Sequence, residues 1–206
     1  LAYPENRIPI MYDFFVNMPS CGDNISDFIS IDVDFGDTKQ EFYIGNSAIA
    51  VPGNIAGLFH VHDKLGRMPI KEILYPAINA AKNGVIIDKF QSYCIKILEP
   101  IITYSDYGKQ IFMEEDSLLN EGKILKMPEF SDFLEILSIE GIDLFYKGEI
   151  STLIQKLNNN GGLIGKKDLE QYNVIEREPI ATNFKNYTVL TNPPPAISGL
   201  LIDFIL

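Results

Sequence analysis

The apolar residues change their spacing near Asn54, and this change limits what the chain can fold into. Over residues 1–53, stretches such as ISIDVDFG and EFYIGNSAIAV alternate apolar and polar residues, as strands do. Over residues 54–172, apolar residues recur every three or four positions, as they do in helices. Residues 173–206 return to strand spacing, then pass through three prolines into an apolar run that starts another helix. The sequence therefore predicts the α+β class, with strands and loops, a helical region, then strands and a Pro-rich turn.

Residues that favour helix ends and turns define the expected elements within these regions. The expected helix starts are Asn54, Pro69, Asp88 and Pro128, and shorter helices are expected over 141–146 and 149–158. Pro76 should kink the second helix, and the third should carry one apolar stripe from Phe90 to Ile101. Lys185 and Asn186 should form a hairpin turn. No repeat and no low-complexity linker interrupts the chain, so residues 1–206 are expected to form a single domain.

Charge and cysteine content argue against several classes of partner. The chain has 17 Lys and Arg against 28 Asp and Glu, a net charge of −11, which disfavours binding to nucleic acid. No apolar run is long enough for a membrane span. Cys21 and Cys94 form neither a disulfide framework nor a zinc motif, and Cys94 is interpreted as a small core residue.

The sequence contains no self-sufficient catalytic or cofactor motif. His60 and His62 would point to different faces of a helix and could not share a metal ion. The acidic run from Glu114 to Asp116 is interpreted as a solvated turn. Neither a phosphate-binding glycine motif nor a G-x-S-x-G nucleophile motif is present. No metal or other cofactor is therefore predicted, and no catalytic residue is expected within this chain.

Three stretches together resemble the gamma-glutamyltransferase (gamma-glutamyltranspeptidase) family. They are SAIAVPGNIAGLFHVHDKLGRMPIKEILYPAINAAKNGV at 47–85, LFYKGEISTLIQKLNNNGGLIGKKDLEQYNVIEREPI at 144–180, and YTVLTNPPPAISG at 187–199. The family pattern runs A-V-P-G, G-R-x-P and P-A-I, then F-Y-x-G, G-G-L and R-E-P, and finally P-P-P-S-S-G-G. The order and spacing of these motifs extend through most of the chain.

The resemblance implies an N-terminal-nucleophile hydrolase, whose αββα sandwich would include this chain as a partial domain. Family precursors cleave themselves into a large and a small subunit, and the Thr exposed on the small subunit attacks a gamma-glutamyl amide. We expect this chain to be an interior fragment of the large subunit, because nothing in the apolar run up to Leu206 would end a helix. The nucleophile would lie outside the chain, and the chain alone would be inactive. The small subunit and a gamma-glutamyl or other acyl-amide substrate are the implied partners, and an isolated fragment could self-associate through open sheet edges.

One stretch departs from the family pattern at a position that binds substrate. Many members have R-E-x-A-P where this chain has YDFFVNMP at 12–19, and Phe15 then takes the place of the Arg that binds the substrate's α-carboxylate. This D-F-F pattern indicates a separate branch, with Phe14, Phe15 and Asn17 as candidate substrate-binding residues. An acylase or amidase for another acyl group is therefore an alternative, as is a non-catalytic scaffold or binding protein. The sequence does not determine the cellular compartment of the protein, although it slightly favours the cytoplasm.

Overall fold

The computed structural model describes residues 1, 8–20 and 25–206, so Cys21 lies outside the described residues. The chain separates into two compact units. The first unit comprises Leu1–Asn17, Pro52–Leu65 and Gln171–Leu206, and the second comprises Met18–Val51 and Gly66–Glu170. Both contain helices and strands, which confirms the α+β class. That residues 1–206 belong to one domain stays a prediction.

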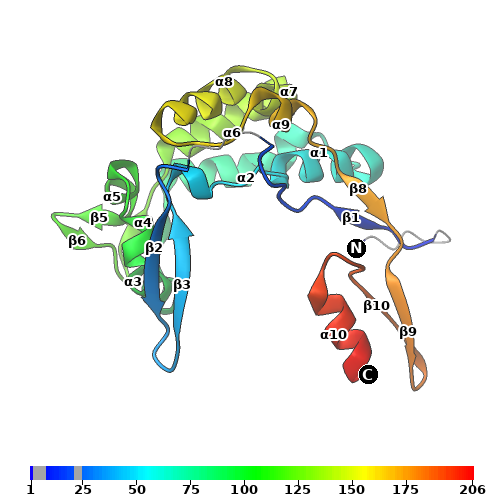
Figure 1. Cartoon of the computed structure of the whole chain (residues 1–206). Coiled ribbons are helices and arrows are strands. Elements are labelled where there is room, and N and C mark those ends of the chain that lie inside the picture. Colours follow the sequence, from blue (N-terminus) through cyan, green and yellow to red (C-terminus); the bar gives the residue numbers. More distant parts are fainter. Residues whose placement is uncertain (2–7, 21–24) are drawn as a thin grey trace. The chain divides into compact units, whose positions relative to one another are not determined.

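The first unit combines two antiparallel strand pairs with two helices (Figure 1). Its elements are β1 (Met11–Asp13), α1 (Asn54–Leu65), β8 (Ile175–Arg177), β9 (Ile180–Phe184), β10 (Tyr187–Thr191) and α10 (Ile197–Ile205). Strand β1 pairs with β8, and β9 pairs with β10. The predicted hairpin turn is confirmed, with Lys185 at a φ of 55°. The hydroxyl of Thr182 in β9 donates a hydrogen bond to Asp203, the one charged residue of α10, and so ties this helix to the hairpin.

The second unit is mainly helical and contains short strand pairs (Figure 1). Its longer elements are β2 (Ile29–Asp34), β3 (Lys39–Ile44), α2 (Ile70–Asn83), α3 (Lys89–Ile97), α6 (Pro128–Glu140) and α8 (Glu149–Lys156). Its shorter helices are η1 (Asn46–Ala48), α4 (Glu99–Ile102), α5 (Asp106–Phe112), α7 (Asp143–Tyr146), η2 (Leu157–Asn160) and α9 (Lys166–Glu170). Two-residue strands β4 (Val85–Ile86) and β7 (Ile124–Leu125) pair, as do β5 (Met113–Glu114) and β6 (Ser117–Leu118). These two small pairs were not predicted.

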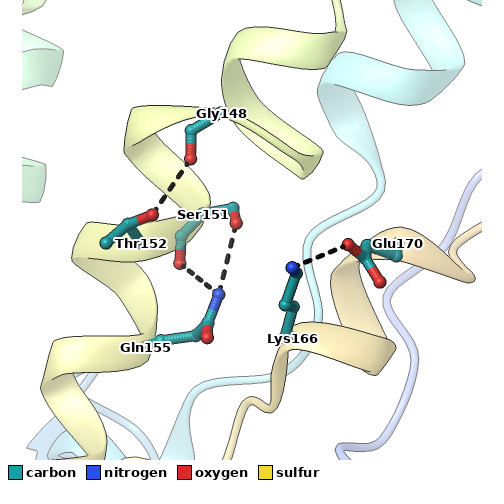
Figure 2. Close-up of polar contacts among 6 residues, drawn as sticks. All are labelled: Gly148, Ser151, Thr152, Gln155, Lys166 and Glu170. Atoms are coloured by element: carbon teal, nitrogen blue, oxygen red, sulfur yellow. Dashed lines mark hydrogen bonds and ion pairs between the residues drawn. The ribbon is translucent and has the colours of Figure 1, made fainter.

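Helices α2 and α6 pack against each other, and buried polar contacts join them. Ser131, which is 1% exposed, donates its hydroxyl to the carbonyl of Ile78 at 3.0 Å. The amide of Met127, just before α6, donates to the carbonyl of Ala81 at 2.9 Å. A buried serine in α8 is satisfied differently, because Gln155 donates to both the carbonyl and the hydroxyl of Ser151 within the same helix (Figure 2).

Most predicted helix boundaries are confirmed, and one predicted helix is wrong. Helices α1 and α6 begin at the predicted residues Asn54 and Pro128. Helices α2 and α3 begin one residue after the predicted starts, with Pro69 and Asp88 at their N-cap positions. The single stripe from Phe90 to Ile101 is not formed, because the chain breaks at Leu98 between α3 and α4. Pro100 has no N–H to donate to the carbonyl of Lys96, so one continuous helix would lose a hydrogen bond there. Phe90 is 72% exposed and Cys94 half-buried, so neither is a fully buried core residue.

The two histidines and the acidic run, for which the sequence argues against a metal-binding role, have other surroundings in the structure. His60 pairs with Glu176 and His62 with Asp63, so the two rings have different partners. Glu115 and Asp116 form the exposed turn between β5 and β6, as predicted, with φ values of 49° and 60°. The described residues contain no cluster of His, Cys, Asp and Glu that could hold a metal ion.

Within the same part of the chain, no helix is long and apolar enough to cross a membrane.

The capping box at the start of α3 gives a test of this fold. The carboxylate of Asp88 accepts from the amide of Gln91 at 2.7 Å, and the Gln91 side chain accepts from the amide of Asp88 at 2.9 Å. Replacing Asp88 by Ala should lower the free energy of unfolding by about 1 kcal/mol, because the N–H of Gln91 in the first turn of the helix loses its acceptor. Urea unfolding followed by circular dichroism measures this change. Asp37→Ala, in an exposed turn, is the matched control, and equal effects of the two changes would contradict the assigned cap.

Candidate functional site

A cavity of about 850 Å³ lies within the first unit and brings together segments distant in the sequence. The end of β1 and the residues after it form one wall, and the start of α1 forms another. Arg177 of β8 and the loop between β10 and α10 complete the lining. The lining residues are Met11, Tyr12, Asp13, Phe14, Phe15, Val16, Pro52, Gly53, Asn54, Arg177, Asn192, Pro193, Pro195, Ala196, Ile197 and Ser198. Two segments that resemble family motifs, A-V-P-G and P-P-P, therefore contribute to one cavity.

Phe15 is held by both of its backbone polar groups, while its side chain stays accessible. Its amide donates to Oδ1 of Asp13 at 3.1 Å, and its carbonyl accepts from the hydroxyl of Tyr172 at 2.7 Å. The residue is 76% exposed. Because the backbone is fixed from two sides, an apolar group that binds the ring need not order this segment first. Phe15 thus contributes an accessible aromatic ring, on a backbone held at two points, to the lining of the cavity.

Phe14 anchors the same segment against α1. A Cβ atom on Gly57 would lie 2.0 Å from Cγ of Phe14, so the ring occupies the space that a side chain at position 57 would need. A Cβ on Gly53 would lie 1.9 Å from the Tyr172 hydroxyl oxygen and 2.2 Å from the Phe14 carbonyl oxygen. Only glycine allows these close approaches. The glycine of the A-V-P-G motif is therefore needed to let Tyr172 reach Phe15.

An ion pair joins strand β1, close to Phe15 in the sequence, to strand β8. Nε of Arg177 donates to Oδ2 of Asp13 at 2.7 Å, with side chains 29% and 19% exposed. Partial burial raises the pKa of Asp13, but the hydrogen bonds from Arg177 and the Phe15 amide, with the charge of Arg177, outweigh it. The pKa of this carboxyl is consequently held below its ordinary value of 3.8. Asp13 links Arg177 to the backbone of Phe15 and stays ionised at neutral pH.

Further contacts hold β1 and β8 to α1. Tyr12 lies opposite Glu176 in the strand register, and its ring meets the ring of His60 edge-on at 5.6 Å between centroids. Nε2 of His60 lies 2.8 Å from Oε1 of Glu176, and Lys64 lies 3.3 Å from the same oxygen. Hydrogen bonds from His60 and Lys64 lower the pKa of Glu176. One turn of α1 is thereby attached to the strand that carries Arg177.

The structure brings together part of the predicted substrate-binding set. Phe14 and Phe15 line the cavity, whereas Asn17 is exposed and is not among the described residues that line it. Substrate binding by these three residues stays a prediction. Asp13, Tyr172 and Arg177 were missed, although Asp13 lies within YDFFVNMP and Arg177 within the R-E-P motif. The positions of Asp13 and Arg177 within these motifs could have marked them as candidates. Their contacts could not be predicted, because they join residues more than 150 positions apart in the sequence.

The comparisons with known proteins identify the family. The family model described as Gamma-glutamyltranspeptidase matches residues 31–206. The chain belongs to this family. It is 35% identical over 161 residues to the glutathione hydrolase proenzyme of Escherichia coli, an alignment that covers 77% of this chain and 28% of that protein. It is 30% identical over 172 residues to the acylase ACY 1 proenzyme of Pseudomonas sp. strain SE83, covering 82% of this chain and 31% of that protein.

The solved structures agree with this assignment. The gamma-glutamyltranspeptidase from Pseudomonas nitroreducens, complexed with L-DON, superposes with a TM-score of 0.78 at 25% identity. The match covers 98% of this chain and 58% of that one. The chain therefore has the α+β fold of the N-terminal-nucleophile hydrolases in this family. It spans about 28% of the length of the Escherichia coli relative, which is named as a proenzyme.

The ion pair gives a pH-dependent prediction. The folded state lowers the pKa of Asp13, so its stabilisation is fully present above the unfolded-state value of 3.8 and is lost as pH falls through the folded value. Asp13→Asn should lower the free energy of unfolding by about 1–3 kcal/mol at neutral pH and by clearly less near about pH 2.5. Urea unfolding at both pH values measures the two differences. Asp37→Asn controls for general charge effects, and a pH-independent loss for Asp13→Asn would contradict the ion pair.

Proposed function

We propose that the complete protein is an N-terminal-nucleophile amide hydrolase or acyl transferase that acts on gamma-glutamyl or related acyl amides. The observation that carries this proposal is the family match, which extends from residue 31 to residue 206 and includes the three stretches at 47–85, 144–180 and 187–199. Relatives named as glutathione hydrolase and acylase proenzymes support a precursor that is processed. This chain would form an interior part of the large subunit.

The reaction would use a Thr that self-cleavage exposes on a small subunit outside this chain. Its hydroxyl would add to the amide carbonyl while its own α-amine accepts the proton, and the amine product would leave from the tetrahedral intermediate. Water or an acceptor amine would then take the acyl group. The contribution of this chain would be the cavity, in which Phe15 and neighbouring apolar side chains orient the acyl group.

A small subunit of the same precursor is the partner that this proposal requires. Helix α10 follows the Pro-rich loop and presents large apolar side chains to solvent, with Phe204 89% and Ile205 79% exposed. Apolar side chains gathered on one helix indicate an interaction surface. Helix α10 is accordingly the first candidate for contact with the small subunit.

An acylase with a different acyl group is the second candidate function, and Phe15 favours it. The α-carboxylate of a gamma-glutamyl group would meet an aromatic ring at the position where many family members have Arg. A carboxylate without a partner there would lose a charge-assisted hydrogen bond. An acyl group that places apolar atoms against Phe15 would fit this wall better. The D-F-F pattern would then mark members with this altered preference.

The chain alone should have no amide hydrolase activity, because the proposed nucleophile, its base and most of the oxyanion donors lie outside it. Incubation of the purified chain with a gamma-glutamyl anilide and with neutral acyl anilides tests this expectation. Aniline release should match that of a heat-denatured control. A release rate that grows in proportion to the concentration of the folded chain would contradict the assignment of the nucleophile to another subunit.

In the complete, processed protein, Phe15→Arg should shift specificity toward gamma-glutamyl substrates. A charged hydrogen bond contributes roughly 1.5–3 kcal/mol, so the ratio of kcat/KM for gamma-glutamyl over neutral acyl anilides should rise about tenfold to a hundredfold. Phe15→Leu is the matched control, since it keeps an apolar side chain and should leave the ratio nearly unchanged. A folded Arg variant with the wild-type ratio, or a wild type that already prefers glutathione, would contradict the role of Phe15.

A further inference from the structure

The hairpin of β2 and β3 in the second unit has two unlike faces (Figure 1). Side chains alternate between the faces of a strand, so every second residue belongs to the same face. One face is mainly apolar and includes Val33, which is 1% exposed. The other, here called the acidic face, carries the exposed side chains of Phe28, Ser30, Asp32, Asp34, Glu41 and Tyr43. Among the described residues, the acidic face is therefore an unpartnered sheet surface.

Two carboxylates oppose each other on the acidic face. Asp32 of β2 lies directly opposite Glu41 of β3 in the strand register. Like charges at such positions destabilise a strand pair. Lys39 lies opposite Asp34 near the turn, and within the described residues none of these three acids forms an ion pair. The hairpin keeps a repulsion that its own residues do not offset, and departures of this kind from local rules are expected where a protein binds something.

The carboxylate of Glu41 is fixed beside an accessible aromatic pair. The hydroxyls of Ser30 and Tyr43 donate to its two oxygens, and these hydrogen bonds hold the pKa of Glu41 below its ordinary value of 4.5. The ring of Tyr43 stacks on that of Phe28, with 4.8 Å between centroids. The two aromatic residues are 52% and 46% exposed. This combination suits a guanidinium group, which pairs with carboxylates through its planar fork and stacks on aromatic rings.

A groove beside β2 extends the acidic face. It has a volume of about 480 Å³ and lies between β2, α3 and the start of α4. Asp32, Asp34 and Glu99 supply three carboxylates to its lining, against one cation, Lys96. The remaining lining residues are mainly apolar: Val33, Phe35, Gly36, Tyr93, Ile97 and Pro100. An acidic groove with apolar walls can take a long cationic side chain, whose aliphatic stem needs apolar contact.

We propose that the acidic face and this groove dock an arginine-bearing segment of a partner protein. One guanidinium would lie between Asp32 and Glu41 with its plane against Tyr43, and a second arginine would enter the groove. Exposed ion pairs contribute little singly, so a free guanidinium compound would bind weakly, whereas a segment makes several contacts at once. Nucleic acid and anionic membranes would be repelled by the same carboxylates. No residue of the acidic face lines the cavity near Phe15, so this inference does not depend on the proposed function.

Calorimetric titration of the complete, processed protein with short peptides tests this docking. The probe is acetyl-RLRLR-amide, and the comparison compounds are acetyl-KLKLK-amide, acetyl-QLQLQ-amide and argininamide. The RLRLR peptide should bind about tenfold or more tightly than the QLQLQ peptide and argininamide, and about threefold or more tightly than the KLKLK peptide. Equal affinity for the KLKLK or QLQLQ peptide would overturn the recognition of guanidinium. Equal affinity for argininamide would overturn the choice of a protein segment as the occupant.

Matched variants locate the binding on the hairpin. Asp32→Asn should weaken binding of the RLRLR peptide about fivefold or more, whereas Asp132→Asn, at an exposed acid of α6, should change it less than about twofold. Because Asp32→Asn also removes the repulsion with Glu41, its Tm should equal or exceed that of the wild type, so unfolding cannot explain the loss. Glu41→Gln should weaken binding in the same way. Wild-type affinity in both hairpin variants, an equal loss in Asp132→Asn, or a lower Tm for Asp32→Asn would overturn the proposal.

Discussion

The ion pair between Asp13 and Arg177 supports the cavity wall on which the proposed function depends. Strands β1 and β8 have three residues each, and so short a pair needs side-chain contacts to persist. Asp13 and Arg177 connect opposite ends of this pair at 2.7 Å, and the second oxygen of Asp13 holds the amide of Phe15. The desolvation cost of a partly buried pair is offset here because the carboxylate has a partner on each oxygen. Loss of the Asp13 carboxylate would therefore remove both the cross-strand ion pair and the acceptor of the Phe15 amide.

Two family motifs gain a structural explanation from this arrangement. The glycine of A-V-P-G leaves room for Tyr172 to reach the Phe15 carbonyl, and the arginine of R-E-P is the cation that holds Asp13. Both residues act on the segment YDFFVNMP, which we propose departs from the family pattern. Residues of two family motifs thus hold the backbone of Phe15, an aromatic residue that we propose stands where many members have Arg. This contrast underlies the proposed change in acyl-group preference.

Sequence reasoning predicted the local structure well and the cavity only in part. Helix starts at Asn54, Asp88 and Pro128 follow from local capping and proline chemistry, and the structure confirms them within a residue. The break at Leu98 was missed because the apolar spacing continues across Pro100, although the helical hydrogen bonding cannot. The contacts of Tyr172 with Phe15 and of Arg177 with Asp13 span 157 and 164 positions. Spacing along a single sequence carries no information on such pairings, so the resemblance indicated Phe15 but not the residues that hold it.

The central claim is that Phe15, held by Asp13 and Tyr172, faces the acyl group of the substrate. A crystal structure of the complete, processed protein with an acyl group trapped on its nucleophile tests this claim most directly. We expect the acyl chain to lie in van der Waals contact with the Phe15 ring, with the Asp13–Arg177 pair intact beneath it. An acyl group bound away from this cavity, or a Phe15 ring packed into the protein with another residue contacting the acyl chain, would contradict the account.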